Sequence, residues 1–115
     1  MEFHAERTNA SVAGDYYQLL FEADADSGDL ESPYLMLQRQ FEFEDRGRCS
    51  VETHDENFIG EFILMQIEFT REPLMVRLDR PDDNEIVVTF SLSHSEFEKA
   101  SRVLKIISGE IDPFD

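Results

Sequence analysis

Hydrophobic and polar residues alternate with a period of two along most of the chain between residues 16 and 92. In "YYQLLFEA" (16–23), for example, Tyr17, Leu19, Phe21 and Ala23 fall on one face and the residues between them on the other. This period is typical of a β-strand with one buried face. It predicts strands over 16–23, 34–43, 49–54, 62–70, 74–79 and 85–92.

The alternation also assigns side chains to the apolar face of each predicted strand. That face is expected to hold Leu35, Leu37, Phe41 and Phe43, with Arg39 as an exception, then Cys49, Val51 and Thr53, then Ile63, Met65, Ile67 and Phe69, then Leu74, Val76 and Leu78, and finally Ile86, Val88, Phe90 and Leu92. Short segments rich in Gly, Pro, Asp and Asn separate several of the strands, as in hairpin turns. Together these features predict an antiparallel meander with one face in water.

The period changes after residue 92, where "SHSEFEKASRVLKIISGE" has helical spacing. Ser93 with Glu96 three residues later forms the pattern of a capping box, and Gly109 suits the position after a helix. An apolar stripe of Phe97, Ala100, Val103, Leu104 and Ile107 completes a predicted helix over 94–108. We therefore predict an α+β fold, in which about six antiparallel strands carry a C-terminal helix on one face. The 115 residues fit a single domain, 1–115, with 1–14 as a flexible or edge segment.

The chain is strongly acidic, with 26 Asp and Glu residues against 10 Lys and Arg, for a formal net charge of −16. Its hydrophobic fraction of 41% includes ten Phe, which is enough for a core. A surface of this charge repels nucleic-acid phosphates and anionic membranes, so we expect neither as a partner. It would attract a basic protein and accelerate the encounter. Composition alone leaves open whether the acidity serves a partner or only solubility.

Targeting signals and disulfides are not predicted. Cys49 is the single cysteine, so no internal disulfide can form, and its place in the alternation predicts a buried thiol. The segment "MEFHAERTNASVAG" has no apolar centre flanked by positive charge, and no apolar run approaches the roughly 18 residues of a membrane span. We expect a cytoplasmic protein.

Five carboxylates lie within "EADADSGDLES" (22–32), namely Glu22, Asp24, Asp26, Asp29 and Glu31. A calcium-binding EF-hand loop needs oxygen ligands at positions 1, 3 and 5, glycine at 6 and glutamate at 12. Counted from Asp24, position 5 is Gly28 and position 12 is Leu35, so the spacing fails. We predict no tight calcium site here and interpret the loop as a secondary acidic surface.

No arrangement of residues predicts catalysis. His4, His54 and His94 are scattered, with no HExxH motif and no cluster of cysteine and histidine. There is no glycine-rich phosphate loop, and no nucleophile can be paired with a base. We therefore expect no enzyme activity, no catalytic residue, no metal and no cofactor.

The segment "VETHDENFIGEF" (51–62) groups acidic and polar residues beside apolar ones where a predicted strand runs into a loop. Loops held by a rigid sheet are suited to recognition. We predict partner binding by Glu52, Asp55, Glu56 and Asn57, with Phe58 and Glu61 as further contacts. For the apolar pair Phe58 and Ile59, the pattern favours a role in capping the core.

The order of "YLMLQRQ" (34–40), "VETHDENFIG" (51–60), "LMVRL", "IVVTF" and "FEKASRVLKIISGE" resembles the immunity protein 10 family of bacterial polymorphic toxin systems. The resemblance covers roughly residues 15–110. It implies a cytoplasmic antidote that binds a cognate toxin domain, often a nuclease, and occludes its basic active cleft. Two alternatives stay open: an acidic chaperone of the type III secretion kind that binds an effector segment, and a protein that mimics DNA. The oligomeric state is not predicted.

Overall fold

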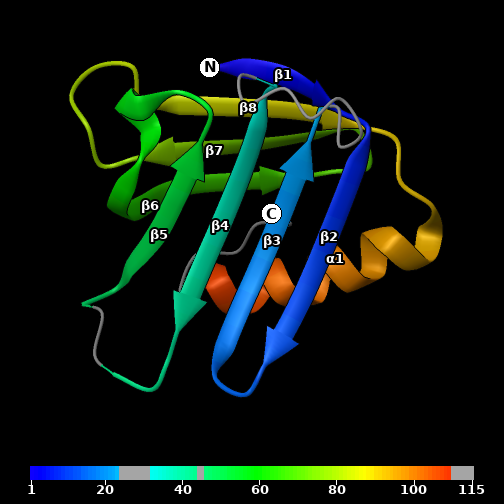
Figure 1. The fold of residues 1–115 in the computed structure, drawn as a ribbon, viewed down its shortest axis with the longest axis horizontal. Helices are drawn as coiled ribbons and strands as arrows, with labels where there is room; N and C mark the ends of the chain where they lie inside the picture. Colours follow the sequence, from blue (N-terminus) through cyan, green and yellow to red (C-terminus); the bar gives the residue numbers. More distant parts are fainter. Residues whose placement is uncertain (24–31, 44–45, 110–115) are drawn as a thin grey trace.

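The computed structural model describes residues 1–23, 32–43 and 46–109, which form eight strands, one short 3₁₀ turn and one α-helix (Figure 1). The elements are β1 (Glu2–Ala5), β2 (Arg7–Ala13), β3 (Tyr16–Glu22), β4 (Tyr34–Gln40), β5 (Arg48–Thr53), η1 (Glu56–Phe58), β6 (Gly60–Phe69), β7 (Pro73–Leu78), β8 (Glu85–Phe90) and α1 (His94–Ser108). The α+β class and the C-terminal helix are confirmed. The prediction of six antiparallel strands is only roughly matched, because residues 1–14 add two more strands.

The strands form one sheet in the order β1-β8-β7-β6-β5-β4-β3-β2. All neighbours are antiparallel except β1, which runs parallel to β8, so the sheet is mixed. The first and last strands of this order are separated along the chain by Glu6 alone. The sheet therefore curls until its two edge strands meet at one bend of the chain.

Figure 1 shows that β2 to β5 run steeply across the molecule, whereas β7, β8 and much of β6 cross behind them nearly at right angles. Two such layers are joined where a strand bends from one layer into the other. One corner is the bend at Glu6, where the Glu6 amide donates to the Glu22 carbonyl. The other corner lies within β6, whose pairing with β7 shifts register between Leu64 and Gln66.

The irregularity in β6 overturns part of the predicted burial pattern. Ile63 and Met65 were expected to face the core, but they are 38% and 58% exposed, and Leu64 is buried instead. A bulge inserts one residue into a strand and re-aims the side chains before it. After the bulge, Ile67 and Phe69 return to the core as predicted.

The predicted strand 34–43 is also too long, since β4 ends at Gln40 and both Phe41 and Phe43 are exposed. The Gln40 side chain turns the chain here. Its Nε2 donates to the Phe43 carbonyl at 3.1 Å, and its Oε1 accepts from the Phe43 amide at 2.9 Å. This closed pair of hydrogen bonds ends the extended segment and carries both rings out of the core.

Helix α1 covers the residues predicted for it and has the predicted capping box: the Ser93 hydroxyl accepts from the Glu96 amide, and Glu96 accepts from the Ser93 amide. It packs mainly on β2 and β3, with smaller contacts to β4 and β6. A chain of aromatic rings connects the helix to both layers of the sheet. The ring of Phe97 stacks on that of Phe69 in β6, with 4.8 Å between the ring centres. The ring centre of Phe90 in β8 lies 5.5 Å from those of Phe69 and of Phe21 in β3. Among the described residues, no helix is long and apolar enough to cross a membrane.

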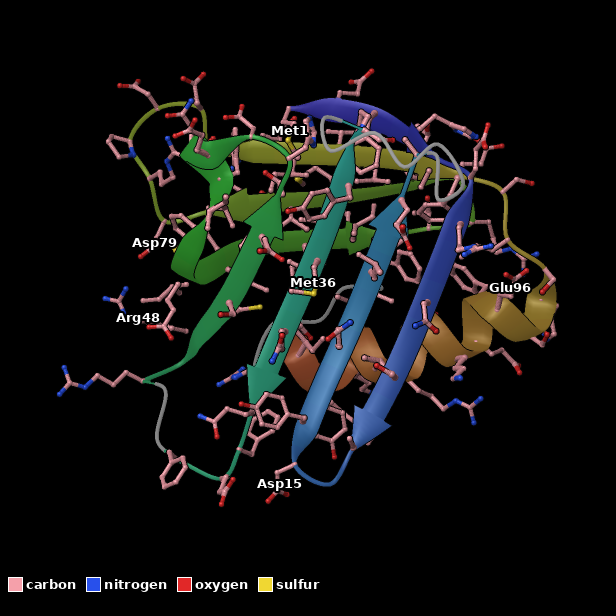
Figure 2. All side chains as sticks on the ribbon, in the orientation of Figure 1. Met1, Asp15, Met36, Arg48, Asp79 and Glu96 are labelled. Carbon is pink, nitrogen blue, oxygen red and sulfur yellow. The ribbon has the colours of Figure 1, made fainter. Side chains whose placement is uncertain are left out.

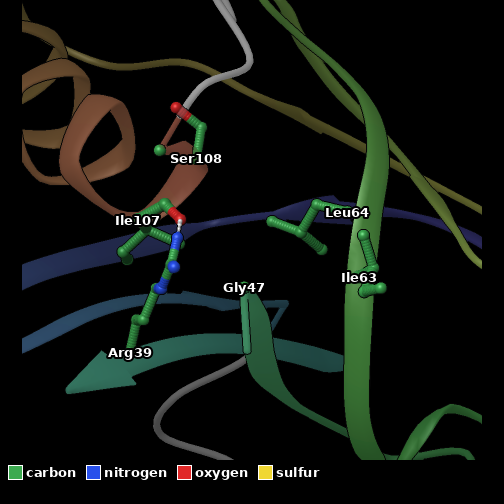
Figure 3. A pocket seen from close by; sticks show the side chains of 7 residues that line it. Arg39, Gly47, Ile63, Leu64, Ile107 and Ser108 are labelled. Carbon is green, nitrogen blue, oxygen red and sulfur yellow. Dashed lines mark hydrogen bonds between the residues drawn. The ribbon is translucent and has the colours of Figure 1, made fainter. Parts of the chain in front are cut away.

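Arg39, the exception on the apolar face of β4, lies at the C-terminal end of α1. Its Nη1 donates to the Ile107 carbonyl at 3.0 Å (Figure 3). Its guanidinium also lies 5.0 Å from the centre of the Phe41 ring. A cation is favourable at this end of a helix dipole. A cavity of about 380 Å³ between Arg39, Leu64 and Ile107 marks where the curled sheet meets the helix. Arg39 thus anchors the helix to β4.

Candidate functional site

The segment between β5 and β6 is fixed by hydrogen bonds among its own residues. The buried Thr53 hydroxyl donates to the Asp55 carbonyl at 2.9 Å and accepts from the Asp55 amide at 3.0 Å. Asp55 caps η1, because its Oδ1 accepts from the Asn57 amide at 3.0 Å and from the Asn57 Nδ2 at 3.1 Å. A short polar side chain commonly caps a turn in this way. Asp55 and Asn57 therefore hold the shape of the loop.

Arg80 supports the same loop from the turn between β7 and β8. Its guanidinium lies 4.9 Å from the centre of the Phe58 ring, and its Nη1 donates to the Asn57 carbonyl. Phe58 is 4% exposed and belongs to the core, whereas the next residue, Ile59, is 51% exposed. The loop is thus secured on its inner side by Phe58 and presents Ile59 outward.

A shallow hollow of about 250 Å³ lies where β4, β5 and the start of β6 meet. Its lining combines apolar side chains with two carboxylates, from Met36, Ser50, Val51, Glu52, Ile59, Gly60 and Glu61. The strand register explains the grouping, because Glu52 lies opposite Met36 and Glu61 lies opposite Ser50. Gly60 has a φ of +150°, a backbone conformation that favours glycine and brings the chain into β6 beside the hollow.

The two carboxylates of the hollow are available to a cation. Glu52 and Glu61 are exposed, and neither forms an ion pair within the part of the chain that the structure describes. Arg48 reaches only the main-chain carbonyl of Glu61, at 3.5 Å. Burial and the nearby Glu52 carboxylate raise the pKa of Tyr34 above its ordinary value. Negative charge beside an apolar floor suits a long cationic side chain, which packs its stem on apolar groups and pairs its head.

The predicted contact residues are only partly brought together. Glu52 and Glu61 share the hollow, and Glu56 is exposed in the first turn of η1. Asp55, Asn57 and Phe58 serve mainly to build the loop. In the secondary acidic surface, Glu22 is half-buried at the end of β3. The other four residues, Asp24, Asp26, Asp29 and Glu31, lie outside the described residues. The prediction that this loop holds no tight calcium site therefore falls on residues that the structure does not describe.

Neighbouring polar residues have structural tasks. The His54 Nδ1 accepts from the Tyr34 amide at 3.2 Å, and its ring meets Phe3 of β1 edge to face. The single cysteine, Cys49, is 1% exposed on the core side of β5, as its alternation predicted. Within the described ranges, no three His, Cys, Asp or Glu side chains are grouped so as to hold a metal ion.

Two contributors to the site were missed from the sequence. Met36 occupies a position that the alternation gives to the solvent face of β4, and a single apolar residue at such a position is too common to mark a site. Arg80 contacts the loop from a distant turn, and nothing in its local sequence indicates this contact. Long-range packing of this kind becomes visible only in the folded chain.

The fold and site define a class: a curled, mixed α+β sheet domain that presents a carboxylate-flanked hollow on a rigid loop. No family model, no curated protein and no solved structure matches this chain. The resemblance to immunity proteins therefore stays a prediction, and the functional conclusion rests on the site.

Proposed function

We propose that this chain is an immunity protein, a stoichiometric inhibitor that binds a basic cognate toxin domain and occludes its active cleft. The observation that carries the proposal is the hollow between Met36 and Ile59, flanked by Glu52 and Glu61. A lysine or arginine of the partner would lay its aliphatic stem on the two apolar side chains and place its charge between the carboxylates. Clefts that act on nucleic acid are lined by such cations.

The rigid loop and the charge of the chain support this mechanism in different ways. Hydrogen bonds through Thr53 and Asp55, together with the Arg80 contact, order the loop before binding, which lowers the entropic cost of association. The net charge of −16 attracts a basic partner over longer distances. Steering of this kind acts mainly on the association rate and weakens as salt screens the charges.

The test begins by capturing partners on the tagged chain from extracts of the native cell at low salt. A partner that salt elutes is identified by mass, and its toxic domain is expressed alone. We expect a basic protein whose activity is blocked by one equivalent of the chain and whose association slows markedly as salt rises. Failure to capture any basic partner, or a captured partner that the chain leaves fully active, would contradict the proposal.

A matched pair of double variants tests the site itself. Glu52→Gln with Glu61→Gln should weaken binding at least about tenfold, because two charges facing the partner are lost. Glu2→Gln with Glu68→Gln changes the net charge by the same amount at exposed positions on the other layer, and should weaken binding by no more than about twofold. Equal effects of the two variants would show that only net charge matters and that the hollow is not the site.

A further inference from the structure

The solvent face of β2 to β5 has an uncharged centre between charged outer rows. Two cross-strand rows run over it by register: Asn9, Leu20, Met36 and Glu52 form one, and Ser11, Gln18, Gln38, Ser50 and Glu61 form the other. We call the uncharged part of these rows the plateau: Asn9, Ser11, Gln18, Leu20, Met36, Gln38 and Ser50. Each row is neutral until it reaches a carboxylate of the hollow.

The opposite layer provides a comparison within the molecule. Its solvent-facing rows include Glu2, Val87, Met75 and Glu68 in one, and Glu85, Arg77 and Gln66 in another. The first of these rows is neutral between its two glutamates, whereas in the second Arg77 and Glu85 pair at 3.3 Å. The plateau is the uncharged centre of a strand face whose outer rows carry Arg7 and Glu22 on one side and Arg48 on the other. Figure 2 shows the plateau turned toward the viewer, with Met36 near its middle on β4.

Depletion of charge is what distinguishes the centre of a protein–protein interface from other surface. The plateau has the other features of such a centre. Leu20 and Met36 lie directly opposite one another as an apolar pair, and the opposed amides of Gln18 and Gln38 lie on the next row. These four side chains are already half-buried by their neighbours. Binding a partner would therefore cost little additional side-chain conformational entropy.

We infer that the plateau is the centre of the surface that binds the basic partner, with Glu52 and Glu61 at its rim. This inference rests on the proposed function and extends its site from the hollow across β2 to β5. Register continuity carries it, because both rows lead without interruption from neutral side chains to the carboxylates of the hollow. The partner should therefore present a neutral, hydrogen-bonding area beside its cations. A cationic area alone would meet no charge on the plateau.

The two parts of this surface should differ in kinetics. Carboxylates at the rim set the association rate and its salt dependence, whereas side chains at a buried centre set the dissociation rate. Gln18→Arg places a bulky charge on the plateau, two strands away from Glu52. Gln66→Arg makes the same change at a half-buried glutamine on the other layer.

The probe is the toxic domain captured and expressed as described above. We expect Gln18→Arg to weaken its binding at least about tenfold, mainly by faster dissociation and with an unchanged salt dependence, and Gln66→Arg to stay within about twofold of the wild type. If the two variants bind equally well while the Glu52 and Glu61 variant binds weakly, the plateau inference is overturned and the proposed function stands. If no basic partner is captured, both are overturned.

A second measurement needs no substitution. The four methionines, Met1, Met36, Met65 and Met75, lie on different parts of the molecule, so their methyl groups can report which surface is covered. On adding the toxic domain, the Met36 methyl signal should shift strongly and the Met65 and Met75 signals should stay in place. An unmoved Met36 signal in a formed complex overturns the inference. If the Met36 signal shifts when the chain is concentrated without the toxic domain, the plateau binds a second copy of the chain. That result also overturns the inference.

Discussion

The guanidinium of Arg80 lies over the ring of Phe58, 4.9 Å from its centre, and at the same time donates to the carbonyl of Asn57. One side chain thereby supports both the aromatic anchor and the main chain of the loop that precedes β6. The candidate site depends on this contact between two turns that are distant in sequence, because the loop presents Ile59 and leads directly to Glu61.

Arg80→Ala is therefore expected to loosen the loop. Loss of the cation–π contact and of a charge-assisted hydrogen bond should lower the free energy of unfolding by about 1–2 kcal/mol. Arg77→Ala serves as the control, since its exposed ion pair with Glu85 should contribute only about 0.2–1 kcal/mol. Urea denaturation gives both values, and hydrogen exchange should show faster exchange at residues 55–59 in Arg80→Ala alone. Equal destabilisation without local exchange would count against the contact.

The helix provides the simplest test of the core. Leu104 is fully buried against the sheet, so Leu104→Ala should lower the free energy of unfolding by about 2–5 kcal/mol. Ile106 is 41% exposed on the same helix, and Ile106→Ala should change it by no more than about 0.5 kcal/mol. Chemical denaturation monitored by circular dichroism measures both. Similar effects would mean that the helix packs through a different face.

The helix was predictable to the residue because its signals are local: the capping box, the apolar stripe and Gly109 all lie within one segment. The middle strands were predictable for the same reason. Strands β1 and β2 were not, since β1 pairs with β8 at the far end of the chain and β2 turns mainly small side chains such as Ala10 toward the core. The curl of the sheet depends on these two strands and on the bulge in β6, so it could not be read from alternation.

The site was predictable in part. The sequence placed Glu52 on the solvent face of its strand and identified the following loop as polar. It could not show that Asp55 and Asn57 are bonded to each other, or that Gly60 returns the chain so that Glu61 joins Glu52 beside Met36. Such grouping depends on loop geometry and register, which a hydrophobic pattern does not specify.

The bulge in β6 leads to a prediction that contradicts the hydrophobic pattern. Met65→Gln should change the free energy of unfolding by less than about 0.5 kcal/mol, because Met65 is 58% exposed. Leu64→Ala, at the neighbouring residue, should cost about 2–5 kcal/mol because Leu64 is buried. Unfolding curves of the two variants distinguish the bulged strand from the regular strand expected from the sequence. In a regular strand, Met65→Gln would be the more destabilising substitution and Leu64→Ala the milder one.

The capping box predicts a dependence of stability on pH. Hydrogen bonds from the backbone and side chain of Ser93 lower the pKa of Glu96. A carboxyl group with a lowered pKa in the folded state stabilises the fold above its unfolded pKa, and this contribution is lost as pH falls through the folded pKa. Between about pH 5 and pH 3, the wild type should therefore lose stability relative to Glu96→Gln, which cannot ionise. Denaturation of both proteins over this range tests the sign, and parallel curves would exclude the linkage.

The negative charge of Glu52 can be probed without any partner, through the pKa of Tyr34. Burial is the larger cause of its raised pKa, and the Glu52 carboxylate adds to it because a nearby negative charge opposes formation of the phenolate. Glu52→Gln should therefore lower the pKa of Tyr34 while leaving it above the ordinary value. Ultraviolet titration, with Tyr34→Phe to assign the signal among the three tyrosines, measures the change. Glu68→Gln, on the other layer, is the control for net charge. A Tyr34 pKa that responds equally to both substitutions would show that Glu52 does not lie beside Tyr34 in the folded protein.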